Sequence, residues 1–230
     1  MTASLASDTI YSELRRRIVF AELSPGAEID IEAYAKEFKS SRTPVRDALR
    51  RLDHDGLVDV HPRAGCRVSR VSMKDLVDIL DVREAVSPMA SRLAALRATP
   101  AEIDELEAIA ENGYAGAADV KSILSASQLF HCRVAKLSHN PRLHEITEHT
   151  LEDMERIMRL CGKAPMASEK PLSDHHRLLQ AFRERDADAA AAIELAHIQR
   201  GRGLLIDLAT STQALFDTRV ADESRGGRRS

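Results

Sequence analysis

The chain has 230 residues, 43% hydrophobic content and a formal net charge of −3, so it is long enough to bury one core or two smaller ones. No apolar run approaches the roughly 18 residues of a membrane span and no signal peptide is visible, so we expect a cytoplasmic protein with no membrane partner. Aromatic residues make up 3% and tryptophan is absent, which predicts an aliphatic core, and the abundant alanine and leucine favour helix.

The three cysteines predict neither a disulfide framework nor a metal site. Cys66, Cys132 and Cys161 are odd in number, far apart and outside any CxxC motif. We expect them to be reduced thiols.

Two helical patterns occupy the first forty residues. Ile10, Leu14 and Ile18 recur at steps of four over residues 8–21 and predict the first helix. A Ser-Pro-Gly turn ends at Gly26, and apolar residues over 31–39 predict the second helix.

The third predicted helix covers residues 43–55 and has one apolar and one basic face. Ser41 is its candidate side-chain N-cap, Pro44 falls in the first turn, where its missing N–H costs nothing, and Gly56 is the expected stop. The apolar stripe consists of Val45, Ala48, Leu49 and Leu52. The basic face suits the DNA major groove, where guanidiniums bind guanine edges or phosphates. On this stretch alone, a solvated basic face is an equal alternative.

A hairpin is expected after this helix. Val58 and Val60, and then Val68 and Val71, flank a loop of residues 62–65 with a basic tip. Three helices followed by such a hairpin make a winged helix-turn-helix. In that arrangement the third helix enters the major groove and the wing reaches the neighbouring minor groove or backbone.

From residue 72 the pattern is helical to about residue 210. Helices are expected over residues 73–98, 99–113, 118–138, 141–161, 170–184 and 187–209. Pro88 lies inside the first of them and either kinks it or starts a new helix. We therefore expect an all-α bundle of six or seven helices over residues 72–218, followed by a disordered tail over 219–230.

Three of the nine histidines fall on stripes that otherwise face inward: His131, His175 and His197. Imidazoles converging from separate helices make a nitrogen set suited to zinc, nickel or another first-row divalent ion. Core histidines that are hydrogen-bonded without a metal are the commoner alternative, and the sequence does not show that the three meet. His176 leaves the register of His175 open.

The run LSPGAEI, then SRTPVRDALRRLDHDGLV, then the glycine of the wing resembles the N-terminal domain of the GntR family of bacterial transcription regulators over residues 8–71. The resemblance implies base or phosphate contacts from Arg42, Thr43 and Arg46, with Arg50 a phosphate contact. It also implies that Gly65 lets the wing backbone approach DNA closely, with Arg63 beside it.

The second half resembles the ligand-binding domain of the FadR-like branch of that family. The segments VREAVSPMASRLAA, FHCRVAKLSHNPRL and HRLLQAFRERDADAAAAIELAH carry this resemblance. It implies that His131, His175 and His197 are metal ligands. Many metal-binding members carry an aspartate four residues before the first histidine, where this chain has Ser127. We therefore expect that the metal binds more weakly, that water takes the place of this ligand, or that no metal binds.

The resemblance and the lining residues together suggest an effector site. We expect Arg83, and Arg133 or Arg156, to bind the carboxylate of a small organic acid near Ser127, with the metal as a further contact to that acid. An interhelical salt bridge is the alternative for Arg83. The glutamate that often follows Arg83 by four residues is replaced by Ser87, so the lining is expected to be less acidic than usual.

These observations predict a mainly α protein with a winged helix-turn-helix domain over residues 1–71. It is expected to be a ligand-responsive regulator, a repressor, that binds operator DNA as a homodimer. The alternatives are a helical domain that only dimerises and, more remotely, a metal-dependent hydrolase. Because HExxH, GxSxG and phosphate-binding glycine motifs are absent from the sequence, we do not expect an enzyme.

Overall fold

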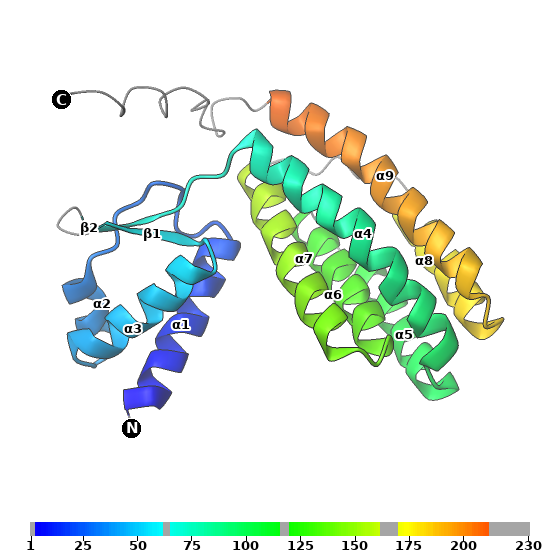
Figure 1. The fold of residues 1–230 in the computed structure, drawn as a ribbon, viewed down its shortest axis with the longest axis horizontal. Coiled ribbons are helices and arrows are strands. Elements are labelled where there is room, and N and C mark those ends of the chain that lie inside the picture. The colour runs from blue at the N-terminus through cyan, green and yellow to red at the C-terminus, as the bar shows by residue number, and fades with distance from the viewer. Residues whose placement is uncertain (1–2, 62–64, 116–119, 162–169, 212–230) are drawn as a thin grey trace, which may run out of the picture. The chain divides into compact units, whose positions relative to one another are not determined.

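The computed structural model describes residues 3–61, 65–115, 120–161 and 170–211. The chain divides into two units, Met1–Val71 and Ser72–Ser230, which are considered separately below (Figure 1). The expected tail over residues 219–230 lies outside the described residues.

The N-terminal unit contains three helices and a two-stranded sheet within its described residues. The elements are α1 Ala3–Val19, α2 Ile31–Glu37, α3 Arg42–His54, β1 Val58–His61 and β2 Gly65–Val68. The strands pair antiparallel, with Val58 opposite Val68 and His61 opposite Gly65. The hairpin therefore follows α3 as expected, except that Gly65 belongs to the second strand rather than to the loop.

The apolar stripes of α1 and α3 form the core of this unit. Leu14, Ile18 and Leu52 are fully buried in it, and the buried faces of β1 and β2 contribute Val58 and Val68. This packing fixes α3 by its apolar side, so its basic side faces outward.

The start of α3 differs from the sequence expectation. Ser41 occupies the N-cap position with an extended backbone, but its side chain makes no capping hydrogen bond. The prediction of a side-chain cap was wrong, although Pro44 lies in the first turn as expected. Gly56 follows the helix with a φ of +71°, a left-handed conformation that glycine adopts without strain.

The second unit is entirely helical in its described residues. Its elements are α4 Met73–Arg97, α5 Pro100–Ala115, α6 Val120–Leu137, α7 Pro141–Cys161, α8 Lys170–Arg183 and α9 Ala187–Ser211. Helix α4 runs through Pro88 as one element, so Pro88 does not start a new helix. Figure 1 shows α4 extending along α9, and the two helices are in contact.

The core of the helical unit is aliphatic with two phenylalanines, as the composition predicts. Phe130 and Phe182 are fully buried together with Leu106 and Leu178. Six helices in the described range agree with the expected bundle, and the mainly helical fold class with a winged helix-turn-helix is confirmed.

Two further observations concern thiols and membranes. Cys66 and Cys132 are free thiols, and burial raises their pKa values to about 11 and about 12. None of the described helices is long and apolar enough to cross a membrane.

Candidate functional site

The exposed side of α3 carries the side chains predicted to contact DNA. Arg42, Thr43, Arg46 and Arg50 are exposed, whereas Val45 and Leu49 on the opposite side are buried. The alternation of buried and exposed positions follows the helical period, because residues three and four apart share a face.

The arginines of α3 differ in their partners. Arg42 forms an ion pair with Glu32 of α2 at 2.8 Å, and Arg50 lies 3.7 Å from Asp47. Within the described part of the chain, Arg46 forms no ion pair. Arg46 is therefore the α3 arginine whose charge is available without breaking an existing contact.

The wing is described only at its base. Gly65 has a φ of +90°, which an L-residue adopts only with strain. Arg63, predicted to lie beside it, falls outside the described residues.

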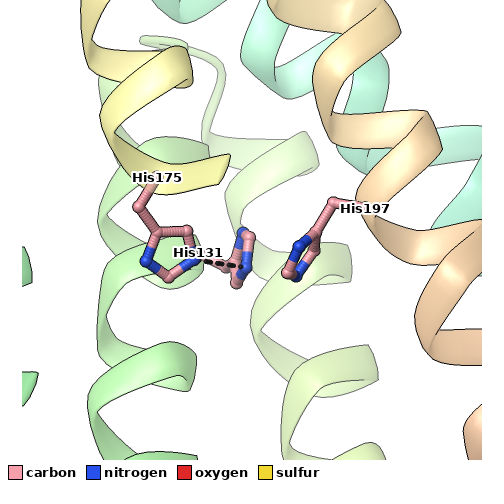
Figure 2. A group of neighbouring side chains, drawn as sticks. All are labelled: His131, His175 and His197. Atoms are coloured by element: carbon pink, nitrogen blue, oxygen red, sulfur yellow. Dashed lines mark hydrogen bonds between the residues drawn. The ribbon is translucent and has the colours of Figure 1, made fainter. Parts of the chain in front are cut away.

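Three helices bring His131, His175 and His197 together. Their candidate ligand nitrogens lie within 4.8 Å of one another, and Figure 2 shows the three rings grouped between the ribbons of α6, α8 and α9. The Nε2 atoms of His131 and His175 are 3.3 Å apart. His131 is 4% exposed and His175 is 0% exposed, whereas the neighbouring His176 is exposed, so the register of α8 places His175 inward.

Packing and two carboxylates orient these rings. Phe130 stacks on His175 with ring centroids 3.8 Å apart. The Nδ1 atom of His131 lies 3.2 Å from Oε1 of Glu194, and the Nδ1 atom of His197 lies 3.2 Å from Oδ2 of Asp174. The His197 contact is a hydrogen bond, whereas Nδ1 of His131 has no aligned hydrogen-bond partner in the described residues. A carboxylate beside Nδ1 with Nε2 toward the ion is the usual arrangement of histidines that bind a metal.

Sequence reasoning did not identify either carboxylate. The signal was present for both, because Glu194 precedes His197 by three residues on the same helix and Asp174 directly precedes His175. Glu194 adds to the lining an acidic group that the sequence analysis did not consider, since it is 1% exposed and lies against His131.

The ionisation of these groups suits a metal. Burial, and secondarily His131, lowers the pKa of His175 well below its ordinary value, and burial lowers the pKa of His197 to about 4. Neutral imidazole is the form that binds metals. Burial raises the pKa of Glu194, but His131, followed by His197 and Arg83, outweighs this and lowers it to about 2.

The spacing of the nitrogens also fits. Two nitrogens bound to one tetrahedral zinc at about 2.0–2.1 Å lie about 3.3–3.4 Å apart, which matches the Nε2 atoms of His131 and His175. The candidate nitrogens of all three imidazoles lie within 4.8 Å of one another, so the third must move closer to complete a three-nitrogen face. The donor set therefore fits a first-row divalent ion.

The predicted effector residues are distributed over two places. Arg83 is buried in α4, where burial lowers its pKa and the Glu194 carboxylate opposes that change. Arg83 forms no ion pair among the described residues, and its Nε atom has no hydrogen-bond partner there, so the alternative of an interhelical salt bridge is not realised. Arg133 instead pairs with Glu105 of α5. Ser127 is half-buried one turn before His131.

Comparison with known proteins gives two family matches. Residues 6–68 match the family described as bacterial regulatory proteins, gntR family, and residues 78–200 match the family described as FCD domain. The second match alone spans more than half of the chain.

Individual proteins give similar results. An uncharacterized HTH-type transcriptional regulator, YdhC of Bacillus subtilis strain 168, is 29% identical over 192 residues, covering 81% of this chain and 85% of that protein. The HTH-type transcriptional repressor RspR of Escherichia coli strain K12 is 25% identical over 193 residues, covering 83% and 84%. The solved structure of E. coli McbR/YncC shares the fold, with a TM-score of 0.72, 24% identity and coverage of 88% and 97%.

Proposed function

This chain belongs to the GntR family of bacterial regulatory proteins and carries an FCD domain, and from that premise we propose how it acts as a transcriptional regulator. In our proposal, α3 binds operator DNA and the helical domain binds a small organic acid with the help of a divalent metal. Binding of the acid changes the affinity for the operator. The protein works in the cytoplasm as a homodimeric repressor. The relative RspR is named a repressor, which supports repression rather than activation.

The exposed arginines of α3 are the observation that supports DNA binding. Arg46 is exposed and has no ion-pair partner among the described residues, so it can reach a base edge or phosphate without a competing contact. Arg42 must break its ion pair with Glu32 before it contacts DNA, so its net contribution to the free energy of DNA binding is smaller. Thr43 and Arg50 lie on the same exposed side, and Gly65 allows the wing backbone to approach the duplex.

Replacing Arg46 with Ala tests the α3 interface. We expect operator affinity to fall by about 1–3 kcal/mol, roughly 5- to 150-fold, because a guanidinium contact to DNA is lost. The measurement is a binding titration with a duplex from the upstream region of the gene. Arg142→Ala, an exposed arginine of α7, is the matched control and should bind normally. Equal affinity of Arg46→Ala and wild type would refute this placement of the recognition helix.

The histidine cluster supports the metal. His131, His175 and His197 supply imidazole nitrogens from three helices, and a divalent ion bound there would act as a positive centre that attracts a carboxylate. The side chain of Arg83, buried near Glu194, supplies a second positive group. Ser127 supplies a neutral hydroxyl where related sequences have an aspartate, which leaves a coordination position for water or for the acid.

Metal analysis of protein purified without chelators tests the site. We expect about one zinc or nickel ion per chain in wild type. His175→Ala should lose most of this metal, because the number of histidine ligands falls from three to two. His176→Ala changes the exposed neighbour and should retain the metal. Metal absent from all three proteins would eliminate the metal from the proposal.

A thermal-shift screen tests whether the helical domain binds an effector or only dimerises. Small carboxylic acids are added to wild type with and without zinc, and a true effector raises the melting temperature by mass action. We expect a shift that depends on zinc and that is lost in Arg83→Gln. No shift across the panel with metal-loaded protein would favour a helical domain that only dimerises.

A further inference from the structure

The carboxylate of Glu194 is the buried acidic group beside the histidine cluster that has no arginine ion pair in the described residues. We propose that Glu194 is a positioning residue for the metal site. Its carboxylate lies beside Nδ1 of His131 and orients the ring so that Nε2 faces the ion. This carboxylate supplies a negative charge near the ion, although it does not take the ligand position at which Ser127 stands. The inference rests on the proposed metal site and adds a residue to it.

The geometry assigns Glu194 a supporting role rather than a bond to the metal. Its Oε1 lies 3.2 Å from Nδ1 of His131, while Nε2 of the same ring lies 3.3 Å from Nε2 of His175. Nδ1 and Nε2 occupy different edges of an imidazole ring. An ion between the two Nε2 atoms is therefore separated from the carboxylate by the ring of His131, and Glu194 acts through that ring.

Such a contact selects one form of the histidine. Nδ1 of His131 has no aligned hydrogen-bond partner among the described residues, so at 3.2 Å Glu194 acts through its charge. That charge favours the His131 tautomer that carries its proton on Nδ1 and leaves the Nε2 lone pair free. The ring is then fixed in a metal-binding orientation before the ion arrives.

The burial of Glu194 indicates that the bundle accommodates a positive charge nearby. The residue is 1% exposed and its Oε2 has no hydrogen-bond partner in the described part of the chain. A buried charge without close compensation is costly, and Arg83 influences Glu194 without forming an ion pair with it. A divalent ion on the far edge of His131 lowers that cost, so carboxylate and metal stabilise each other.

Asp174 provides an internal comparison. It lies within hydrogen-bond distance of Nδ1 of His197, at 3.2 Å, but it also pairs with Arg200 and lies 3.5 Å from Arg177. Its charge is thus compensated within the protein whether or not a metal is bound. Metal affinity is consequently expected to depend more strongly on Glu194 than on Asp174.

The experiment compares metal binding by full-length Glu194→Gln and wild type. Each protein is stripped with a chelator, titrated with Zn²⁺ against a competing indicator, and titrated with Co²⁺ while its visible absorption is recorded. We expect zinc affinity of Glu194→Gln to fall about 10- to 100-fold, the usual loss when a group supporting a metal-bound histidine is removed. The Co²⁺ spectrum of the variant should also change.

Glu155→Gln is the matched control. Glu155 is a second buried glutamate, 3% exposed, with an Oε2 that likewise lacks a hydrogen-bond partner, but it pairs with Arg159 of α7. This variant measures the cost of neutralising a buried glutamate in the same domain. Its zinc affinity should equal that of wild type, even if its melting temperature falls.

A rescue variant separates positioning from general stability. Adding Ser127→Asp to Glu194→Gln places a carboxylate one turn before His131, and this double variant should regain zinc affinity. The melting temperature of each metal-free protein is measured as well, so that a change in zinc affinity is distinguished from a change in stability.

Three outcomes would overturn the inference. They are wild-type affinity in Glu194→Gln, equal losses in Glu194→Gln and Glu155→Gln, and no gain from Ser127→Asp. If wild type itself binds no zinc, the metal part of the proposed function fails together with the inference, whereas the Arg46 measurement still decides DNA binding. If wild type binds zinc and Glu194→Gln binds equally well, only the role of Glu194 fails.

Discussion

At the scale of single residues, two helical glycines of the second unit have opposite surroundings. A Cβ built on Gly113 of α5 would lie 2.9 Å from Cβ of Ala126 in α6, closer than side chains in proteins approach. A Cβ built on Gly201 of α9 meets nothing within 4 Å. The same substitution should therefore have opposite effects at the two positions.

We expect Gly201→Ala to stabilise the protein by up to about 1 kcal/mol, because alanine is the better helix former. Gly113→Ala gains the same propensity but must push α5 and α6 apart, and overpacking costs about 1–3 kcal/mol. The net effect at Gly113 is a loss of stability. Chemical denaturation of both variants beside wild type checks the signs, and stabilisation by Gly113→Ala would show that α5 and α6 separate easily.

At the same scale, the residues around the histidines show which part of the site was predictable. The inward position of His131 and His197 follows from their spacing relative to apolar neighbours, which is a local property of each helix. The same spacing left the choice between His175 and His176 open. The contact between His131 and Glu194 joins α6 to α9. No local pattern encodes that contact, because it depends on how the two helices pack.

At the scale of elements, two helices with serine at the N-cap differ in whether the serine side chain caps them. Helix α4 begins with a complete capping box, in which Ser72 Oγ accepts from the Asp75 amide at 3.1 Å and Asp75 accepts from the Ser72 amide at 2.7 Å. Helix α3 has Ser41 at its N-cap position, and the side chain of Ser41 makes no capping hydrogen bond. Both starts have a serine at the N-cap, but position N3 differs. Asp75 donates its amide to Ser72, whereas Pro44 has no amide N–H to donate to Ser41.

We expect Ser72→Ala to lower the free energy of unfolding by about 0.5–2 kcal/mol, since the first turn of α4 loses an accepted hydrogen bond. Ser41→Ala removes no capping bond and should change stability by less than about 0.5 kcal/mol. Thermal or urea unfolding of the two variants measures the difference. Equal losses would mean that Ser41 caps α3 in solution.

At the scale of the whole molecule, charge is unevenly distributed. The formal net charge is −3, yet the exposed side of α3 presents Arg42, Arg46 and Arg50. The average charge therefore gives no indication of DNA binding, and the local pattern does. Binding by such a surface releases counterions from DNA and weakens as salt increases.

We expect operator affinity of the homodimer to fall steeply with salt. If the three α3 arginines of each protomer contact phosphates, the loss is roughly 10³-fold between about 50 and 200 mM monovalent salt. Binding titrations over that range give the slope of log affinity against log salt, and Arg50→Ala should make it shallower by about 1 for each phosphate contact removed. An affinity insensitive to salt would exclude phosphate contacts by α3.

The sequence by itself determined the elements of this protein and the exposed basic side of α3. Its apolar residues recur with the helical period, its turns carry proline and glycine, and these signals act between residues close in the chain. The two family resemblances rest on the same local motifs, and both family assignments are confirmed.

Only the tertiary structure decided which side chains meet. It placed His175 rather than His176 against His131, brought Glu194 and Asp174 to the imidazoles, paired Arg133 with Glu105, and left Arg83 buried without an ion pair in the described residues. The physical reason is that contacts between helices depend on their relative rotation and spacing. These are set by the packing of all core side chains together rather than by any one segment.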